Sequence, residues 1–233
     1  MEPTISELAQ ELLEKSKVLP DGQRYLVGLS GIPASGKSSL AHAIVNKLNQ
    51  LHRSASLDSN DIAIVVGLDG WHLPRSTLAA MTNAEEAFAR RGAHWTFSGT
   101  DYVSFVQRIR ESRGVLATAP SFSHSTKDPV EDDIQIYSHL KIILIEGLYV
   151  FLSIDPWRSA SELLDERWFV EVDINEAKER IVKRHVETGV TLTMEQARER
   201  AEQNDFPNGD FVITHMLEPT KIIRSVNDSS IAI

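Results

Sequence analysis

The sequence predicts an α/β fold in which a parallel β-sheet is flanked by helices. Short apolar runs alternate with helical patterns along the 233 residues. The apolar runs are continuous in Val, Ile and Leu, which is typical of strands buried on both faces of a sheet. A glycine-rich segment, GIPASGKSS at residues 31–39, lies between the first apolar run and a helical pattern. Together these features indicate a nucleotide-binding α/β domain.

The composition fits a single folded domain over residues 1–233. The chain is 42% hydrophobic and 24% charged, without internal repeats, low-complexity tracts or glycine/serine linkers. It contains no cysteine, which excludes disulfides, thiolate zinc sites and a cysteine nucleophile. Any metal should therefore be held by oxygen ligands.

Charge and hydropathy limit the expected partners. The net charge of −9 argues against nucleic acid as a partner, because nucleic acid binding needs a cationic surface. The sequence has neither an apolar run of about 18 residues nor a signal-peptide pattern, so we expect no membrane partner. A cytoplasmic location is expected, with the nucleus as an open alternative.

An amphipathic helix is predicted near the amino terminus, within residues 1–20. Ile5, Leu8 and Leu12 recur at helical spacing, and Thr4 with Glu7 fits a capping box. We expect this helix to pack against the domain and to take no part in chemistry.

Five strands and five further helices are expected after this helix. The predicted strands are 25–30, 62–68, 141–145, 168–172 and 221–226, and the predicted helices are 37–51, 83–91, 101–113, 175–187 and 193–204. Thr193 and Gln196 form a second capping-box pattern. Ligands of parallel sheets gather at the carboxyl ends of the strands, so the residues after each strand are candidate site residues.

The segment after the first predicted strand matches the P-loop motif G-x-x-x-x-G-K-[ST] in its expected strand-to-helix context. Its glycines let backbone N–H groups surround phosphate oxygens, and the helix amino terminus favours an anion. Lys37 adds a charge for the β and γ phosphates, and Ser38 is placed to ligate Mg²⁺. The predicted ATP-binding residues are Gly31, Ile32, Pro33, Ala34, Ser35, Gly36, Lys37, Ser38 and Ser39. The alternative is a glycine-rich turn with a solvated lysine.

Two carboxylates follow the second and third main predicted strands. Asp69 comes after VVGL, and Glu146 comes at the end of IILIE. One of them can hold Mg²⁺ directly or through water. The other can accept a proton from an attacking hydroxyl, because burial can raise a carboxyl pKa toward neutrality. The residues alone do not show which carboxylate holds the metal and which accepts the proton. For each carboxylate the alternative is a polar strand end that is exposed to solvent and has no role in chemistry.

The motifs together resemble the P-loop kinase group that contains uridine kinase, phosphoribulokinase and bacterial pantothenate kinase. The resemblance rests on ASGKSS, the Asp-Gly-aromatic run, APSFSH and ILIEG, and it extends over about residues 25–226. DGWHLPRS, RRGAHWTF, FSHSTKDPVEDDI and NDFPNGD resemble its nucleoside kinase-like branch. The resemblance implies transfer of the γ-phosphoryl of ATP to a small-molecule hydroxyl, with Asp69 as the catalytic base and Glu146 near the metal.

An acceptor pocket is expected from the segments between the second and third main strands. Aromatic side chains can sandwich a substrate, while His and Arg can fix its hydroxyl or acid groups. We expect acceptor contacts from His72, Arg91, His94 and His124, with an ordinary core or surface role as the alternative for each. Uridine kinases typically carry Tyr at the positions of His72 and Phe122, and T-H-S-R where this chain reads S-H-S-T. A nucleoside such as uridine is the first candidate acceptor, followed by a sugar or a pantothenate-like alcohol.

A small helical lid is expected over residues 174–210. In the kinase group that the chain resembles, this segment closes over ATP and its arginines offset charge on the transferring phosphoryl group. Arg180 and Arg184 lie four residues apart on one helical face, and Arg184 is the expected catalytic cation. A solvated helix face paired with glutamates is the alternative. Gly189 is a candidate hinge, and residues 204–209 are expected to form a turn-rich loop near the adenine.

These expectations combine into an ATP- and Mg²⁺-dependent small-molecule kinase in which Asp69, Lys37 and Arg184 carry out the transfer. A regulatory P-loop NTPase without a small-molecule acceptor is one alternative. A nonenzymatic nucleotide-binding adaptor is another, although the intact P-loop and both carboxylates count against it. The sequence leaves the oligomeric state open, with a homo-oligomer among the alternatives.

Overall fold

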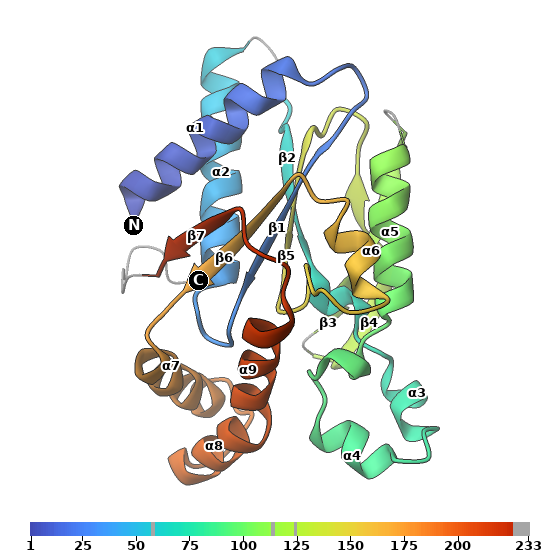
Figure 1. Ribbon diagram of the computed structural model, residues 1–233, viewed down its shortest axis with the longest axis vertical. Coiled ribbons are helices and arrows are strands. Elements are labelled where there is room, and N and C mark those ends of the chain that lie inside the picture. Colours follow the sequence, from blue (N-terminus) through green and yellow to red (C-terminus); the bar gives the residue numbers. More distant parts are fainter. Residues whose placement is uncertain (57–58, 113–114, 124, 226–233) are drawn as a thin grey trace.

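The computed structural model describes residues 1–56, 59–112, 115–123 and 125–225. Its centre is a five-stranded sheet in the order β2-β5-β1-β6-β7, and every neighbouring pair is parallel (Figure 1). The strands are β1 (Tyr25–Gly31), β2 (Ala63–Gly67), β5 (Ile142–Glu146), β6 (Glu166–Glu171) and β7 (Lys221–Arg224). The predicted α/β fold with a parallel sheet is therefore confirmed. The predicted end of the last strand, at 226, lies outside the described residues.

Helices cover both faces of this sheet. α1 (Glu2–Val18) and α2 (Lys37–Ala55) cover one face, while α5 (Gly99–Glu111) and α6 (Trp157–Ser161) cover the other (Figure 1). Along β5, Ile142 and Leu144 join the cluster under α1 and α2, and Ile143 and Ile145 join the cluster under α5 and α6. Successive strand residues point to opposite faces, so a continuous apolar run is needed to fill both layers.

The first helix packs against the sheet as expected, but its predicted cap is wrong. The helix begins at Glu2 with Met1 as the N-cap, so Thr4 lies inside the first turn and caps nothing. Pro3 explains the earlier start, because proline is favoured in the first helical turn, where its missing N–H costs no hydrogen bond.

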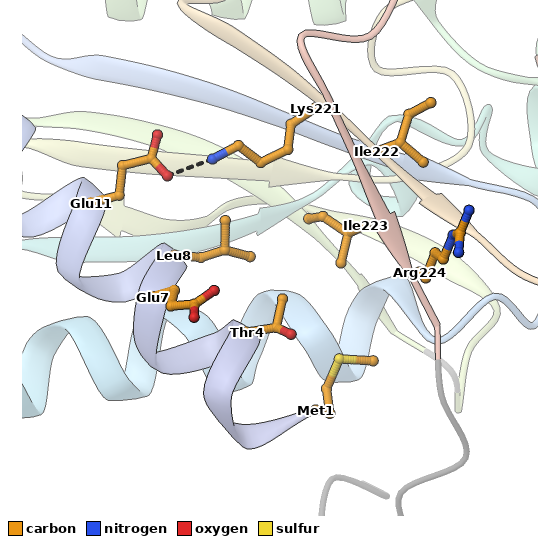
Figure 2. A pocket seen from close by; sticks show the side chains of 9 residues that line it. All are labelled: Met1, Thr4, Glu7, Leu8, Glu11, Lys221, Ile222, Ile223 and Arg224. Atoms are coloured by element: carbon orange, nitrogen blue, oxygen red, sulfur yellow. Dashed lines mark hydrogen bonds and ion pairs between the residues drawn. The ribbon is translucent and has the colours of Figure 1, made fainter.

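One side of helix α1 lies beside the edge strand β7. Glu11 and Lys221 form an ion pair of 2.5 Å there, beside a pocket of about 410 Å³ between the helix and the strand (Figure 2). This contact connects the amino-terminal helix to the last described strand.

A second, smaller layer was not predicted. β3 (Ala117–Ser123) and β4 (Asp128–Ile136) form an antiparallel hairpin separate from the main sheet. The hairpin runs beside α5, and its end at Ser123 and Asp128 lies near the short helices α3 (Arg75–Ala79) and α4 (Ala84–Ala89) (Figure 1). Pro120 and Pro129 argue against strands in the sequence, and the mostly exposed β4 lacks a long apolar run.

The predicted lid region is entirely helical apart from one connection. It contains α7 (Ile174–Glu187), α8 (Met194–Arg200), a π-helical turn (Ala201–Asp205) and α9 (Phe206–His215). Gly189, predicted as a break, lies between α7 and α8 with a φ of +69°, a conformation that glycine adopts readily. The Thr193 hydroxyl accepts the Gln196 N–H as predicted, but the Gln196 side chain accepts from Leu192.

The expectation of a turn-rich loop at 204–209 is wrong, because this stretch continues the helix. Pro207 lies in the first turn of α9, where proline is tolerated. Asn204 and Asn208 are buried and hydrogen bonded, so these residues favour the helix through contacts that a local sequence pattern does not reveal.

None of the helices within the described ranges combines the length and the hydropathy that crossing a membrane would require. The assignment of the whole chain to one domain, with residues 174–210 as its lid, stays a prediction.

Candidate active site

The glycine-rich segment forms a tight loop between β1 and α2. Gly31 ends the strand, and Gly36 caps the helix with a φ of +86° that favours glycine. A Cβ on Gly31 would lie 2.5 Å from the Ser35 hydroxyl oxygen. The Ser35 N–H donates to the carbonyl of Ile32 at 3.1 Å, which closes the turn. The backbone from Ala34 to Ser39 thus surrounds the helix amino terminus, an arrangement that suits a phosphate group.

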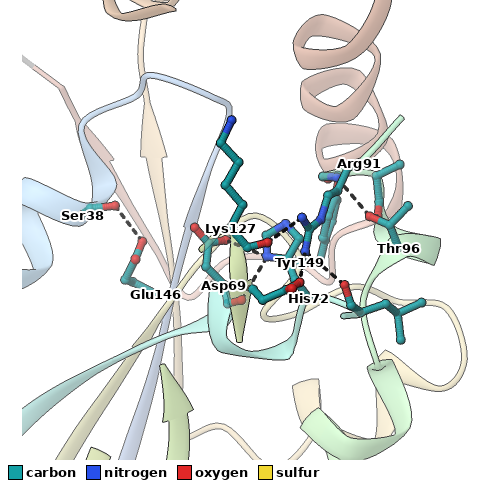
Figure 3. Close-up of polar contacts among 12 residues, drawn as sticks. Ser38, Asp69, His72, Arg91, Thr96, Lys127, Glu146 and Tyr149 are labelled. Carbon is teal, nitrogen blue, oxygen red and sulfur yellow. Dashed lines mark hydrogen bonds and ion pairs between the residues drawn. The ribbon is translucent and has the colours of Figure 1, made fainter. Parts of the chain in front are cut away.

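Glu146 lies beside this loop because of the strand register. As the last residue of β5 it pairs with Leu29 of β1 and with Gly67 of β2, which places its carboxylate at the centre of the sheet edge. The Ser38 hydroxyl donates to Glu146 Oε2 at 3.0 Å (Figure 3). Two oxygen groups that we predicted as metal ligands therefore face each other.

Lys37 and Glu146 modify each other's ionisation. Burial lowers the pKa of the Lys37 ammonium, and the Glu146 carboxylate opposes this effect. Burial likewise raises the pKa of Glu146, and Lys37 opposes that rise. Opposite charges that are partly removed from water in this way are costly without further partners. Phosphate oxygens and a cation would supply such partners here.

The Ser38 hydroxyl and the Glu146 carboxylate suit Mg²⁺ better than they suit a metal ion whose ligands all come from the protein. In the described part of the chain, no group of three or more His, Asp or Glu side chains is arranged to hold a metal ion. Mg²⁺ usually takes only one or two protein ligands and completes its shell with phosphate oxygens and water. Ser38 and Glu146 fit that requirement.

Asp69 lies at the same edge of the sheet, in a short 3₁₀ turn (η1, Leu68–Trp71) directly after β2. Its side chain is 59% exposed, in contrast to the half-buried Glu146. The Asp69 charge acts on the pKa of both Lys37 and Glu146, so the carboxylate lies close to the P-loop. An exposed carboxylate near a half-buried cation is free to meet a second substrate.

The glycines that follow both carboxylates are required by close packing. A Cβ on Gly70 would lie 2.2 Å from the carbonyl oxygen of Pro120, and a Cβ on Gly147 would lie 2.3 Å from Leu68 Cβ. Gly70 thus lets the β3–β4 hairpin pack directly against the turn that holds Asp69.

We predict that Gly70→Ala lowers the free energy of unfolding by about 2 kcal/mol, because the added methyl group overlaps backbone that cannot move alone. Gly67→Ala is the matched control, since its Cβ would meet nothing closer than 3.6 Å. Urea unfolding of both variants measures the difference. Equal stability of Gly70→Ala and the parent chain would contradict this packing argument.

His72 lies next to Asp69. Its Nδ1 is 2.9 Å from the Asp69 carbonyl oxygen and 3.8 Å from Asp69 Oδ1 (Figure 3). The ring packs between Phe97, with centroids 3.9 Å apart, and Phe122, at 4.9 Å. The structure therefore brings His72 next to Asp69, the carboxylate that we predicted as the base. The His72 ring and its aromatic neighbours form a wall beside that carboxylate.

Arg91 lies nearby, but its guanidinium is used by the chain itself. Nη1 donates to the carbonyl of Lys127 at 2.6 Å, and Nη2 forms an ion pair with Asp128 at 3.2 Å (Figure 3). Nη2 also donates to the carbonyl of Leu73. These contacts connect the segment just before η2 (His94–Thr96) to the hairpin. A direct contact of Arg91 with an acceptor stays a prediction.

His94 faces α9. Its ring stacks on Phe211, with centroids 4.1 Å apart and planes 5° apart. Burial lowers the pKa of His94, and the neighbouring His215 lowers it further, which favours the neutral imidazole. His94 is thus placed between the acceptor side and α9, the last helix of the predicted lid region. The fourth predicted acceptor residue, His124, lies outside the described residues.

The lid arginines have different surroundings. Arg180 donates to the Ala34 carbonyl at 3.4 Å and to the Ser225 hydroxyl at 3.1 Å, and it pairs with Glu176. This side chain thereby joins α7 to the P-loop. Arg184, one turn later, lies close enough to Lys37 for its charge to lower the Lys37 pKa. Its position suits the predicted cationic role, which stays a prediction.

Sequence reasoning missed Asp205 and Tyr149. The charge of Asp205 acts on the pKa of both Lys37 and Tyr149, so it too lies near the P-loop. The Tyr149 hydroxyl donates to the carbonyl of Gly92 at 2.8 Å. The NDFPNGD run was the signal for Asp205, but its assignment to a loop near the adenine hid the carboxylate.

The sheet order, the P-loop after the central strand and the carboxylates after its neighbours define the class of the protein, a P-loop nucleotide-binding fold. No model of a known protein family matches the sequence. The ATP-dependent kinase-like protein notR' of Aspergillus versicolor is 43% identical over 159 residues, which cover 67% of this chain and 92% of that protein. The Schizosaccharomyces pombe protein named "Putative uridine kinase C227.14" is 33% identical over 224 residues, covering 96% and 93% of the two chains.

The chain therefore belongs to the uridine kinase-like family of P-loop kinases. The fold agrees with this result. The crystal structure of YFH7 from Saccharomyces cerevisiae, described as "a putative P-loop containing kinase with a circular permutation", superimposes with a TM-score of 0.84 at 20% identity, covering 96% of this chain and 99% of that one. At that identity the similarity supports the fold alone.

Proposed function

We propose that this protein transfers the γ-phosphoryl group of ATP to the hydroxyl of a small molecule. One observation supports this above others: the exposed Asp69 carboxylate shares a sheet edge with the half-buried Lys37 and Glu146. Such an edge offers a phosphate site and a proton acceptor within reach of each other. Membership in a family of ATP-dependent kinases supports ATP as the donor.

In this proposal the backbone of the P-loop binds the phosphates, and Lys37 with Arg184 offsets the charge of the transferring group. Asp69 accepts the proton of the acceptor hydroxyl while the hydroxyl oxygen forms a bond to the γ-phosphorus. The bond from that phosphorus to the β–γ bridging oxygen breaks, and ADP leaves with the bond's electrons. Ser38 and Glu146 would hold Mg²⁺, which neutralises phosphate charge when it is bound.

The acceptor side favours a molecule with a flat ring. His72 and Phe122 form an aromatic wall beside Asp69, with the buried Phe97 packed behind His72, and such walls bind planar groups. A nucleoside such as uridine is the first candidate, in agreement with the name of the Schizosaccharomyces pombe relative. A sugar or a pantothenate-like alcohol is the second candidate, because Phe122 and His72 replace the tyrosines expected in uridine kinases. A regulatory P-loop NTPase would not need this wall.

The test is incubation of the purified protein with Mg·ATP and single nucleosides, sugars or pantothenate. Mass spectrometry would identify a phosphorylated product, and ADP would be measured in parallel. The proposal expects a product from one class, with one ADP formed per product. ADP formation at the same rate with and without every acceptor, and no phosphorylated product, would contradict a kinase and favour an NTPase.

A further inference from the structure

A buried polar contact joins the lid helix to the π-helical turn. His185 Nε2 and Asp205 Oδ2 are 2.9 Å apart, and the two side chains are only 9% and 17% exposed. The ring nitrogen donates and the carboxylate accepts. Among the other ion pairs that the described residues of α7 form, Lys183–Glu187 is 72% and 60% exposed, and Arg180–Glu176 is 23% and 30% exposed. The His185–Asp205 contact is less exposed than either of them.

Residues on either side of Asp205 are hydrogen bonded to Arg90 and Arg91, which precede η2. Asn204 Nδ2 donates to the carbonyl of Arg91 at 3.1 Å. Arg90 donates to the carbonyl of Gln203 at 2.6 Å and to Asn208 Oδ1 at 3.1 Å. The π-helical turn thus has a fixed place against the segment that leads to η2. An extra residue in a helical turn shifts the register of the side chains, and such turns are frequent at functional sites.

Arg184 directly precedes His185 on α7, and the two side chains leave the helix about 100° apart. The charge of Arg184 lowers the Lys37 pKa, so the two like charges lie near each other and repel until phosphate lies between them. Within the described ranges no carboxylate forms an ion pair with Arg184. Contacts elsewhere on α7 must therefore hold Arg184 near Lys37, and the contact of Arg180 with the Ala34 carbonyl is one of them.

We propose that His185 and Asp205 are positioning residues for phosphoryl transfer, and that their hydrogen bond fixes the rotation of α7 so that Arg184 faces the P-loop. The inference rests on the proposed function, because it acts through the lid role of Arg184. Loss of the hydrogen bond lets α7 turn away and relieves the repulsion between Arg184 and Lys37. A displacement of about 1 Å in such a group can cost about a hundredfold in rate.

The test needs no acceptor. The probe is Mg·ADP with aluminium fluoride, which mimics the transferring phosphoryl group, compared with Mg·ADP alone by calorimetry. The ratio of the two affinities measures stabilisation of the transferring group. His185→Phe keeps a ring without a donor and should lower this ratio about tenfold, with Mg·ADP affinity changed less than about threefold. His185→Gln keeps a donor and should restore most of the ratio.

Lys183→Ala is the matched control on the same helix, and it should leave the ratio unchanged because its ion pair is exposed. All titrations are made at a temperature where circular dichroism shows each variant to be folded. If His185→Phe does not fold, His185→Leu takes its place, and His185→Gln is compared with it.

The double variant separates this inference from the proposed function. Arg184→Ala should lower the ratio, and adding His185→Phe should lower it no further, because both changes remove the same effect. An unchanged ratio in Arg184→Ala would refute the lid role itself. A lowered ratio in Arg184→Ala but not in His185→Phe, or two effects that add fully, would overturn the positioning role alone.

Discussion

Asp69→Asn abolishes phosphoryl transfer to the acceptor while ATP still binds: this is the largest effect that we expect. A positioned general base contributes about 10²- to 10⁴-fold, and the asparagine amide cannot accept the hydroxyl proton. We therefore expect kcat for the acceptor found in the product screen to fall by about 10³-fold. ATP affinity should change by less than about threefold, because the carboxylate is exposed and lies beside the P-loop, not within it.

Asp61→Asn is the matched control, since Asp61 precedes the same strand β2 at its opposite end and pairs with Arg53. It should leave turnover unchanged. Steady-state kinetics give kcat, and calorimetry with a non-hydrolysable ATP analogue gives the affinity. If Asp69→Asn retains more than about a tenth of the parent turnover, another group takes the proton and the base has been assigned wrongly.

Lys37→Ala should have the second-largest effect. The charge of Lys37 acts on Glu146, and its removal takes a full charge from the phosphate site. Loss of one such stabilising group costs about 10²- to 10³-fold in rate. We also expect the loss of affinity, relative to the parent chain, to be larger for ATP than for ADP, because the lysine serves the β and γ phosphates.

Lys47→Ala provides the comparison on the same helix, because Lys47 makes a 3.7 Å contact to Glu2 far along α2 from the P-loop. Melting temperatures are measured for both variants, since Lys37→Ala also leaves Glu146 without its cation. A Lys37→Ala protein that stays folded and binds ATP as tightly as the parent chain would show that the lysine does not serve the triphosphate.

The sheet and the P-loop were predictable because their signals are local. Continuous apolar runs identify the five strands, and the motif identifies the loop between β1 and α2. Asp69 and Glu146 were found from the sequence because parallel strands bring their carboxyl ends to one edge. The register of Glu146 between Leu29 and Gly67 agrees with that expectation.

The remaining features depend on contacts between distant segments. Asn204 and Asn208 read as turn residues, yet their amides are buried against Arg90 and Arg91, more than 100 positions away. The β3–β4 hairpin likewise packs on Gly70 through Pro120, a residue that locally disfavours a strand. In these places tertiary packing overrides the local preference.

The aromatic wall and the β3–β4 hairpin come from one continuous stretch between β2 and β5, while the ATP side comes from β1, α2 and the lid. Under the proposed function, substitutions within that one stretch alter the acceptor side without changing the residues of the P-loop or the lid. Gly70 and Pro120 both lie inside that stretch, so any altered hairpin must still fit against a glycine at position 70.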